Sequence, residues 1–181
     1  MPAILLLATL LAVTLLPDPV SAESADYTGL QLQGRGEARY LGMIKVYDAA
    51  LYSPPGTPVE RMLDPDISRC LDLKYAVSLK VDDFIRGADT VLARQYDETE
   101  LDPVRAEIDA LHRSYRAVAK GDRYALCYDA STRETTLALN RQELVRITSA
   151  DFARVYFGIW LGPEAPLDEK LRDRLLANRR Q

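Results

Sequence analysis

The sequence predicts an α+β fold, with one large antiparallel sheet covered on one side by helices. Three observations lead to this prediction. Apolar and polar residues alternate most clearly from Leu71 to Leu79, which is typical of a half-buried strand. A polar turn at residues 129–134 separates two further alternating runs and indicates a hairpin. Later segments repeat apolar residues at the spacing of helices that pack on a sheet.

Five or six short strands are expected to build the sheet. The alternating runs are Leu30–Gln33, Met43–Leu51, Leu71–Leu79, Tyr124–Tyr128 and Thr135–Leu139. Between the first two, Gly34-Arg35-Gly36 lacks the third glycine of a dinucleotide-binding loop, so we expect a hairpin turn there.

Four helices are expected in the remaining segments, each preceded by a residue that can cap it. The expected starting residues are Asp82, Asp102 followed by Pro103, Thr148 with Asp151 as a capping box, and Asp168.

Residues 1–22 have the pattern of a signal peptide, with an apolar run at Ile4–Leu16 and a small-residue cleavage site at Val20–Ala22. The apolar run is shorter than the roughly 20 residues that span a bilayer, so a retained membrane anchor is the weaker alternative. Cleavage would leave residues 23–181, a length suited to a single domain. We therefore expect a periplasmic or secreted protein without an integral membrane span after processing.

The 23 basic and 27 acidic residues nearly balance, which indicates neither nucleic acid nor an anionic membrane surface as a partner. Cys70 and Cys127 would meet an oxidising compartment and form either a disulfide or two unpaired thiols. Together with His112, which we expect at the surface, they supply too few ligands for a metal site. No catalytic residue and no cofactor is assigned.

Arg39 is the candidate functional residue, because it lies among apolar and tyrosine residues in the segment 34–52. Its guanidinium stays charged at ordinary pH and offers a planar fork of donors that matches a carboxylate. With Tyr40, Tyr47 and Tyr52 around it, Arg39 indicates a pocket that binds an anion. The alternative is a solvated arginine at the edge of a strand.

The same segment, GRGEARYLGMIKVYDAALY, resembles the strand pair of bacterial, secreted chalcone isomerase-like proteins. Further segments match that family in order: CLDLKYAVSLKVDDF (70–84), GDRYALCYD (121–129), LALN (137–140), DFARVYFGIWLG (151–162) and LDEKLRDRLL (167–176). The resemblance implies an open-faced β-sandwich whose ligand cleft lies between the large sheet and the flanking helices.

The enzyme for which the family is named uses an arginine, a threonine and a tyrosine to close a flavanone ring. The resemblance puts Tyr47 at the threonine, Phe84 at the tyrosine and Val91 at an asparagine, so that only the arginine, Arg39, persists. Losing one donor to a developing oxyanion can cost about 3–4 kcal/mol of transition-state stabilisation. The pattern therefore resembles the non-catalytic, fatty-acid-binding branch of the same fold.

We accordingly expect a fatty acid or similar amphipathic carboxylate as the ligand. Arg39 and Tyr47 would contact its carboxylate in a cleft between sheet and helices. Side chains expected to line that cleft are Phe84, Val91, Tyr75 and Tyr156, for which ordinary core packing is the alternative. Two other functions stay open: an intramolecular lyase that performs chalcone isomerase-type ring closure, and an interaction module of the cell envelope.

Overall fold

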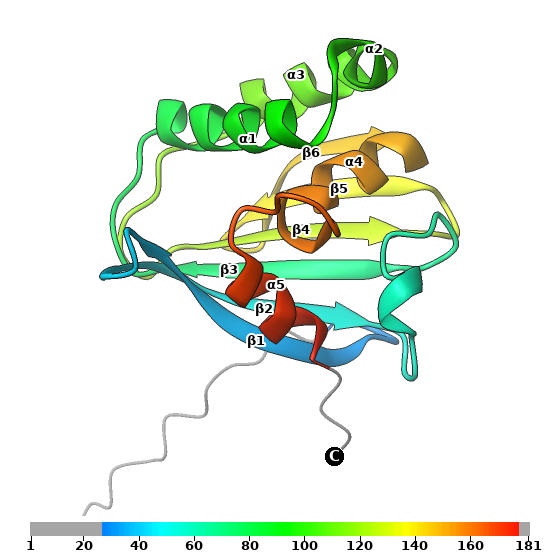
Figure 1. Cartoon of the computed structure of the whole chain (residues 1–181), viewed down its shortest axis with the longest axis horizontal. Coiled ribbons are helices and arrows are strands. Elements are labelled where there is room, and N and C mark those ends of the chain that lie inside the picture. Colours follow the sequence, from blue (N-terminus) through cyan, green and yellow to red (C-terminus); the bar gives the residue numbers. More distant parts are fainter. Residues whose placement is uncertain (1–26, 178–181) are drawn as a thin grey trace, which may run out of the picture.

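A six-stranded antiparallel sheet forms the base of the structure, a computed structural model that describes residues 27–177 (Figure 1). Each strand pairs with the next strand of the chain, so that order in the sheet equals order in the sequence. The strands are β1 (Gln31–Tyr40), β2 (Ile44–Ser53), β3 (Arg69–Tyr75), β4 (Arg123–Asp129), β5 (Glu134–Leu139) and β6 (Gln142–Thr148). The predicted signal segment, residues 1–22, lies outside the described residues.

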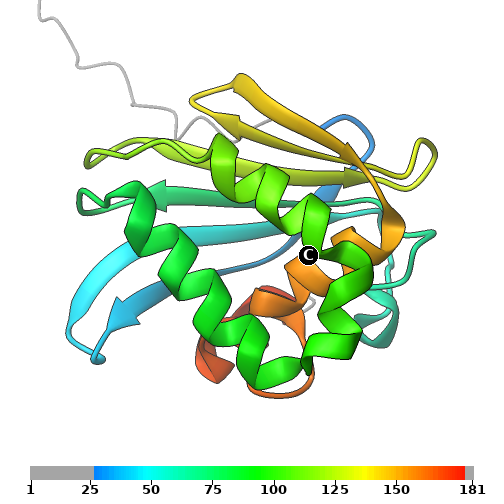
Figure 2. The same ribbon diagram turned by 90° about the horizontal axis from the view of Figure 1, so that it is seen from above.

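The α-helices lie on one face of this sheet, which confirms the predicted α+β arrangement (Figures 1 and 2). They are α1 (Val81–Gln95), α2 (Glu98–Leu101), α3 (Arg105–Ser114), α4 (Ala150–Leu161) and α5 (Glu169–Leu176), with short 3-10 turns at Val59–Arg61 and Asp102–Val104. Within residues 27–177, no helix has the length and apolar character that a bilayer crossing requires.

Three helix boundaries differ from the sequence prediction. The helix α1 begins at Val81 with Lys80 as its N-cap, so Asp82 lies in the first turn and does not cap the helix. Residues Asp102–Val104 form a 3-10 turn, and the α-helix begins only at Arg105. Thr148 is the last residue of β6, so the cap of α4 is Ser149, whose Oγ accepts a hydrogen bond of 3.1 Å from the N–H of Phe152. All three shifts are small, since helix ends are defined only to within one or two residues and neighbouring residues can serve as caps.

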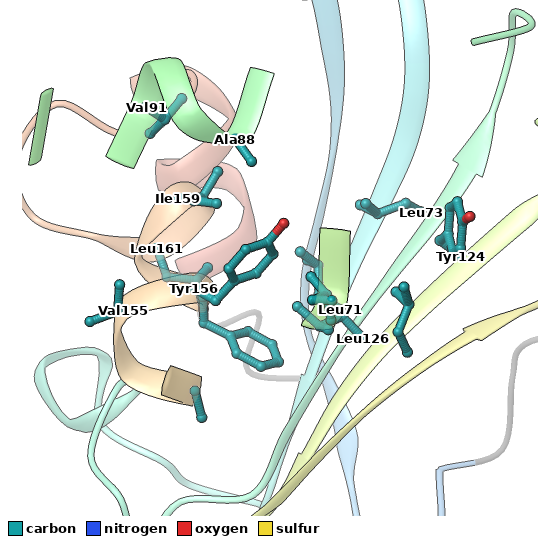
Figure 3. Close-up of a cluster of buried hydrophobic side chains, with 14 of the residues drawn as sticks. Leu71, Leu73, Ala88, Val91, Tyr124, Leu126, Val155, Tyr156, Ile159 and Leu161 are labelled. Atoms are coloured by element: carbon teal, nitrogen blue, oxygen red, sulfur yellow. The ribbon is translucent and has the colours of Figure 1, made fainter. Parts of the chain in front are cut away.

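Alternate residues of β3 form the centre of the core. Leu71 and Leu73 face the helices and are buried, as their alternation with polar residues predicts. Figure 3 shows them, with Leu126 of β4, opposite Tyr156 and Ile159 of α4. Complete burial of one such aliphatic side chain stabilises a fold by about 1.5–3 kcal/mol, so this contact anchors α4 on the sheet.

Gly34 and Gly36 lie within β1, at the place where α5 packs against this strand. The prediction of a hairpin turn at Gly34-Arg35-Gly36 is therefore wrong. A Cβ atom at Gly34 would come 2.2 Å from the backbone oxygen of Arg174, and one at Gly36 would come 2.7 Å from a methyl group of Leu171. The glycines are therefore required because the backbones of β1 and α5 approach each other closely.

The opposite face of the sheet carries a disulfide and a buried carboxylate. Cys70 and Cys127 occupy directly opposed positions on β3 and β4 and are disulfide-bonded, with their Cα atoms 4.0 Å apart. Beside them, the buried carboxylate of Asp72 accepts hydrogen bonds from Arg123 Nη1 at 2.8 Å and from Tyr27 Oη at 2.9 Å. The charge of Asp72 is thus paired, as a buried carboxylate requires.

Candidate functional site

Arg39 does not lie in a cleft between sheet and helices, so that expectation is wrong and the alternative of a solvated arginine holds. Its side chain is 42% exposed. The Nε atom donates to Glu37 Oε1 at 2.7 Å, and Nη1 donates to the carbonyl of Met43 at 3.0 Å. Because side chains alternate along a strand and Ala38 faces the helices opposite Tyr47, Arg39 points to the other face.

Within residues 27–177 the buried arginine is Arg69, at the start of β3. Its guanidinium lies between the rings of Tyr128 and Phe157, at 4.7 and 4.8 Å from their centroids. Nη1 donates to the carbonyls of Asp64 and Ile67, whereas Nε and Nη2 have no partner in the described part of the chain. Burial lowers the pKa of Arg69 to about 10. Aromatic faces and carbonyl oxygens, rather than an anion, stabilise this charge.

Sequence reasoning missed Arg69 although a signal existed. Arg69 is separated from Leu71, Leu73 and Tyr75 by an even number of positions, so the alternation of side chains along β3 already places it on the apolar face. It lines neither of the two hollows described below, and we assign it a role in holding the loop before β3.

Five of the expected cleft residues are packed in the core between the sheet and the helices. The rings of Tyr47 and Tyr75 are 5.6 Å apart, and Tyr75 is also 5.6 Å from Phe84. Tyr156 of α4 is fully buried nearby, as is Val91 of α1 (Figure 3). The ring of Phe84 stacks on that of Tyr115, with their centroids 5.1 Å apart, and it forms an edge-to-face contact with the ring of Tyr124, with the centroids 5.6 Å apart. These aromatic rings, here called the aromatic cluster, fill the space in which a cleft was expected.

The tyrosines of the aromatic cluster are neutral and mostly hydrogen-bonded. Tyr47 Oη accepts from Trp160 Nε1 at 2.9 Å, and the hydroxyls of Tyr115 and Tyr156 are 2.7 Å apart. Burial raises the pKa of Tyr47, Tyr75, Tyr115 and Tyr156 above the ordinary tyrosine value. These phenols therefore stay protonated at neutral pH, and none of them is suited to act as a base.

A groove of about 950 Å³ lies between α1 and α3. From above, these two helices run side by side over α4 (Figure 2). A smaller hollow of about 340 Å³ lies at Arg35, Glu37 and Arg174. The groove walls carry apolar side chains along most of their length: Val81, Ile85, Leu92, Ala93, Tyr96 and Leu101. Here it is called the α1–α3 groove.

His112 forms part of the groove lining and is buried, which corrects the expectation of a surface histidine. Its ring lies 6.0 Å from both Tyr115 and Tyr156, so it connects the groove to the aromatic cluster. Nδ1 is 3.9 Å from Asp89 Oδ1, and Nε2 has no partner within residues 27–177. Burial lowers the pKa of His112, with Asp89 and Asp109 opposing the shift. The imidazole is therefore neutral at pH 7.

Two arginines of α3 supply the positive charge of the groove. Arg105 is half-buried and Arg113 is exposed, and neither guanidinium forms a hydrogen bond or ion pair with residues 27–177. The acidic side chains of the lining are Asp89, Asp97, Glu98 and Asp109. Asp97 is engaged as the cap of α2, where its carboxylate accepts from the N–H of Glu100 at 2.9 Å. The groove thus combines apolar walls with two guanidinium groups that have no partner in the described part of the chain.

The family follows from the sequence itself. Residues 11–177 match the profile of the family described as chalcone isomerase-like. The chain belongs to the chalcone isomerase-like family. The resemblance inferred from the motifs around Arg39 is thereby confirmed over nearly the whole length. No curated protein sequence matches this chalcone isomerase-like protein.

A solved structure supports the same fold. The crystal structure of an Arabidopsis thaliana fatty-acid binding protein superposes with a TM-score of 0.65, at 16% sequence identity, over 84% of this chain and 89% of that chain. At this identity the likeness shows that the two proteins share a fold. In this chalcone isomerase-like protein, Phe84 and Val91 carry no hydrogen-bonding group on the side chain, and the hydroxyl of Tyr47 accepts a hydrogen bond from Trp160.

Proposed function

We propose that this protein binds an amphipathic molecule with an alkyl chain and a carboxylate, such as a fatty acid, without catalysing a reaction on it. The observation that carries the proposal is the α1–α3 groove, in which apolar walls lie beside the guanidinium of Arg105, a group without a hydrogen-bond or ion-pair partner within residues 27–177. Its volume of about 950 Å³ falls in the range of roughly 300–1,000 Å³ that ligand pockets span. The fatty-acid binding function of the Arabidopsis protein with the same fold supports the same choice.

The apolar walls would supply most of the binding free energy. Each methylene group transferred from water to such a surface contributes about 0.8 kcal/mol, so affinity rises with chain length. Among the lining residues, Leu92 and Leu101 are buried, whereas Val81 and Ile85 are half-buried and accessible to an alkyl chain. A ligand in this position would cover apolar surface that now faces water.

The residues that line the groove indicate the charge of the head group. Arg105 is the half-buried cation, and a charge-assisted hydrogen bond to it is worth about 1.5–3 kcal/mol. Asp109 lies one helical turn from both Arg105 and Arg113 and would repel a carboxylate. Selectivity for anionic ligands thus depends on the balance between these three side chains.

Ring closure of a chalcone is the weaker candidate. The position that the family resemblance assigns to a catalytic tyrosine holds Phe84, which cannot donate a hydrogen bond to an oxyanion. The buried tyrosines nearby have raised pKa values and stay protonated. We therefore expect no faster loss of chalcone absorbance with this protein than without it.

A displacement titration tests the binding proposal. The full chain is titrated with the fluorescent probe 1-anilinonaphthalene-8-sulfonate, and palmitate is then added to displace it. We expect Arg105→Gln to weaken palmitate binding about tenfold or more, because one charge-assisted hydrogen bond is lost. Asp109→Asn should strengthen it, because a repelling charge next to Arg105 is removed.

Two matched variants locate the site. Arg94→Gln removes an exposed arginine of α1 outside the groove lining and should leave the affinity unchanged. Arg39→Gln tests the site expected from the sequence. If Arg39→Gln weakened binding and Arg105→Gln did not, the ligand would lie at the β1–β2 hairpin and the groove proposal would be wrong. Palmitate that fails to displace the probe would contradict the ligand class itself.

We also propose that the chain is exported and cleaved after Ala22, giving a periplasmic or secreted protein. The apolar run at Ile4–Leu16 and the small residues before Glu23 support this. A disulfide between Cys70 and Cys127 fits an oxidising compartment. N-terminal sequencing of the protein recovered from a periplasmic extract should begin at Glu23. An intact N-terminus on protein from the cytosol would contradict the proposal.

A further inference from the structure

The tip of the β1–β2 hairpin exposes an unusual amount of apolar surface. Six large apolar side chains are exposed in residues 27–177, and four of them lie at this tip: Tyr40 (63% exposed), Leu41 (74%), Met43 (74%) and Ile44 (56%). The other two, Leu32 and Leu167, are exposed by only 36% and 37%. Figure 2 shows the tip projecting past the rest of the sheet. We call residues 40–44 the apolar tip.

The turn itself does not explain these residues. Leu41 and Gly42 have φ angles of +50° and +71°, and the N–H of Met43 donates to the carbonyl of Tyr40, which closes the turn. Positive φ at both central positions favours Asn-Gly or Gly-Gly, so a leucine at position 41 is locally unfavourable. Since Leu41 is also exposed, it contributes neither to the turn nor to the core.

Charged residues behind the apolar tip are ordered by sign. Arg39 and Lys45 are cross-strand partners and come first after the tip. Their acidic partners lie farther back: Arg39 pairs with Glu37 at 2.7 Å, and Lys45 pairs with Asp48 at 2.6 Å. Arg39 Nη1 also donates to the carbonyl of Met43, which directs part of its guanidinium toward the tip. From the apolar tip back along the hairpin, the side chains are therefore first apolar, then cationic and then anionic.

We propose that the apolar tip inserts into the surface of a lipid bilayer. In that position the four apolar side chains lie at the boundary of the acyl chains, and Arg39 and Lys45 lie at the level of the phosphates. Glu37 and Asp48 stay in water. The near-neutral composition gave no sign of this partner, because the net charge of a chain does not report how charges are arranged on one hairpin.

The shape of the surface favours a bilayer over a protein. The apolar tip is the end of a projecting hairpin and its four large apolar side chains are exposed, so a protein partner would need a matching pocket. A bilayer requires no such complementarity. The inference goes beyond the ligand proposed for the α1–α3 groove and does not depend on it, since none of the groove residues belongs to the hairpin.

A site-specific fluorescent label tests the inference in the full chain. Because both native cysteines are bridged, Leu41→Cys introduces the one reactive thiol, which is labelled with an environment-sensitive nitrobenzoxadiazole dye. Vesicles of phosphatidylglycerol and phosphatidylcholine in equal amounts should raise its emission and shift it to the blue. The same label at Leu167→Cys, the exposed control site, should not respond. The N-terminal apolar run is the same in both samples and cannot produce a difference between them.

Two sets of substitutions separate the apolar and the cationic contributions. Leu41→Asn with Met43→Ser should weaken vesicle binding at least tenfold in a sedimentation assay, while the Asn-Gly turn keeps the fold at least as stable. Arg39→Gln with Lys45→Gln should weaken binding to the anionic vesicles about fivefold for each cation removed and leave binding to phosphatidylcholine alone nearly unchanged.

Three results would overturn the inference. A label at position 41 that does not respond to vesicles excludes insertion of the tip. Equal responses at positions 41 and 167 mean that the chain binds lipid without using the tip. A response at position 41 that grows with protein concentration in the absence of vesicles, together with dimers in analytical ultracentrifugation, means that a second copy of the chain covers the tip instead.

Discussion

Trp160 Nε1 donates a hydrogen bond of 2.9 Å to Tyr47 Oη, which joins the helix α4 to the strand β2 across the core. The bond lies between residues 113 positions apart in the chain. It fixes Tyr47 within the aromatic cluster and thereby keeps closed the space where a ligand cleft was expected.

Tyr47→Phe should destabilise the protein by about 1–3 kcal/mol, because the partly buried Trp160 N–H loses its acceptor. The chain contains one tryptophan, so its fluorescence reports this site directly. Urea unfolding followed by that fluorescence measures the change. Tyr40→Phe, which removes an exposed hydroxyl, is the matched control and should leave the free energy of unfolding unchanged. Equal stability of both variants would contradict the assigned role of the bond.

Gly34→Ala should release α5 from β1. The added Cβ would lie 2.2 Å from the backbone oxygen of Arg174, and backbone atoms cannot move aside as a side-chain end can. We expect a loss of more than 3 kcal/mol in the free energy of unfolding, beyond the range of ordinary substitutions. Gly87→Ala is the control: it lies within α1 with open space around it, and it should stabilise the helix by about 1 kcal/mol. A tolerated Gly34→Ala would mean that α5 does not pack as described.

Replacing both cysteines, Cys70→Ala with Cys127→Ala, should lower the free energy of unfolding by about 4 kcal/mol. The bridge closes a loop with a sequence separation of 57, and the loss of that constraint on the unfolded chain accounts for an effect of this size. Thermal unfolding with and without a reducing agent checks the prediction. The reducing agent should lower the melting temperature of the wild type and leave that of the double variant unchanged.

Acid should destabilise the protein through His112. Burial lowers the folded-state pKa of His112 below the unfolded value of 6.5, so the unfolded chain binds a proton that the folded chain does not. Stability is therefore complete above about pH 6.5 and falls as the pH drops from there toward the folded pKa, by about 1.4 kcal/mol for each unit of the shift. Carboxylates that face the imidazole, Asp89 and Asp109, reduce the effect without reversing it.

His112→Gln removes the titrating group and tests this assignment. Its free energy of unfolding should vary less between pH 7 and pH 5.5 than that of the wild type, whatever its absolute value. An identical pH dependence in both proteins would assign the effect to other groups.

Much of the fold could be predicted from the sequence because its signals are local. Alternation from Leu71 to Leu79 depends only on neighbouring residues, and it placed β3 on the sheet with the correct face toward the helices, although the strand itself ends at Tyr75. The same rule places Arg39 on the opposite face from Ala38 and Arg69 on the same face as Leu71. Applied strictly, alternation would have identified Arg69, rather than Arg39, as the buried cation.

The candidate site could not be predicted to the same extent. Whether Tyr47, Tyr75 and Phe84 line a cleft or fill it depends on the sizes of side chains that come from separate segments and meet in space. The α1–α3 groove arises from the distance between two helices, and no residue pattern within either helix encodes that distance.

By itself, the sequence of this chalcone isomerase-like protein determined its family, its single antiparallel sheet and the face that the helices cover, because hydrophobic periodicity and motif order are properties of short stretches of chain. Only the tertiary structure decided that Arg39 lies in water, that His112 is buried and that the hollow lies between α1 and α3. Burial is set by what distant segments place around a side chain, and that information exists only once the chain has folded.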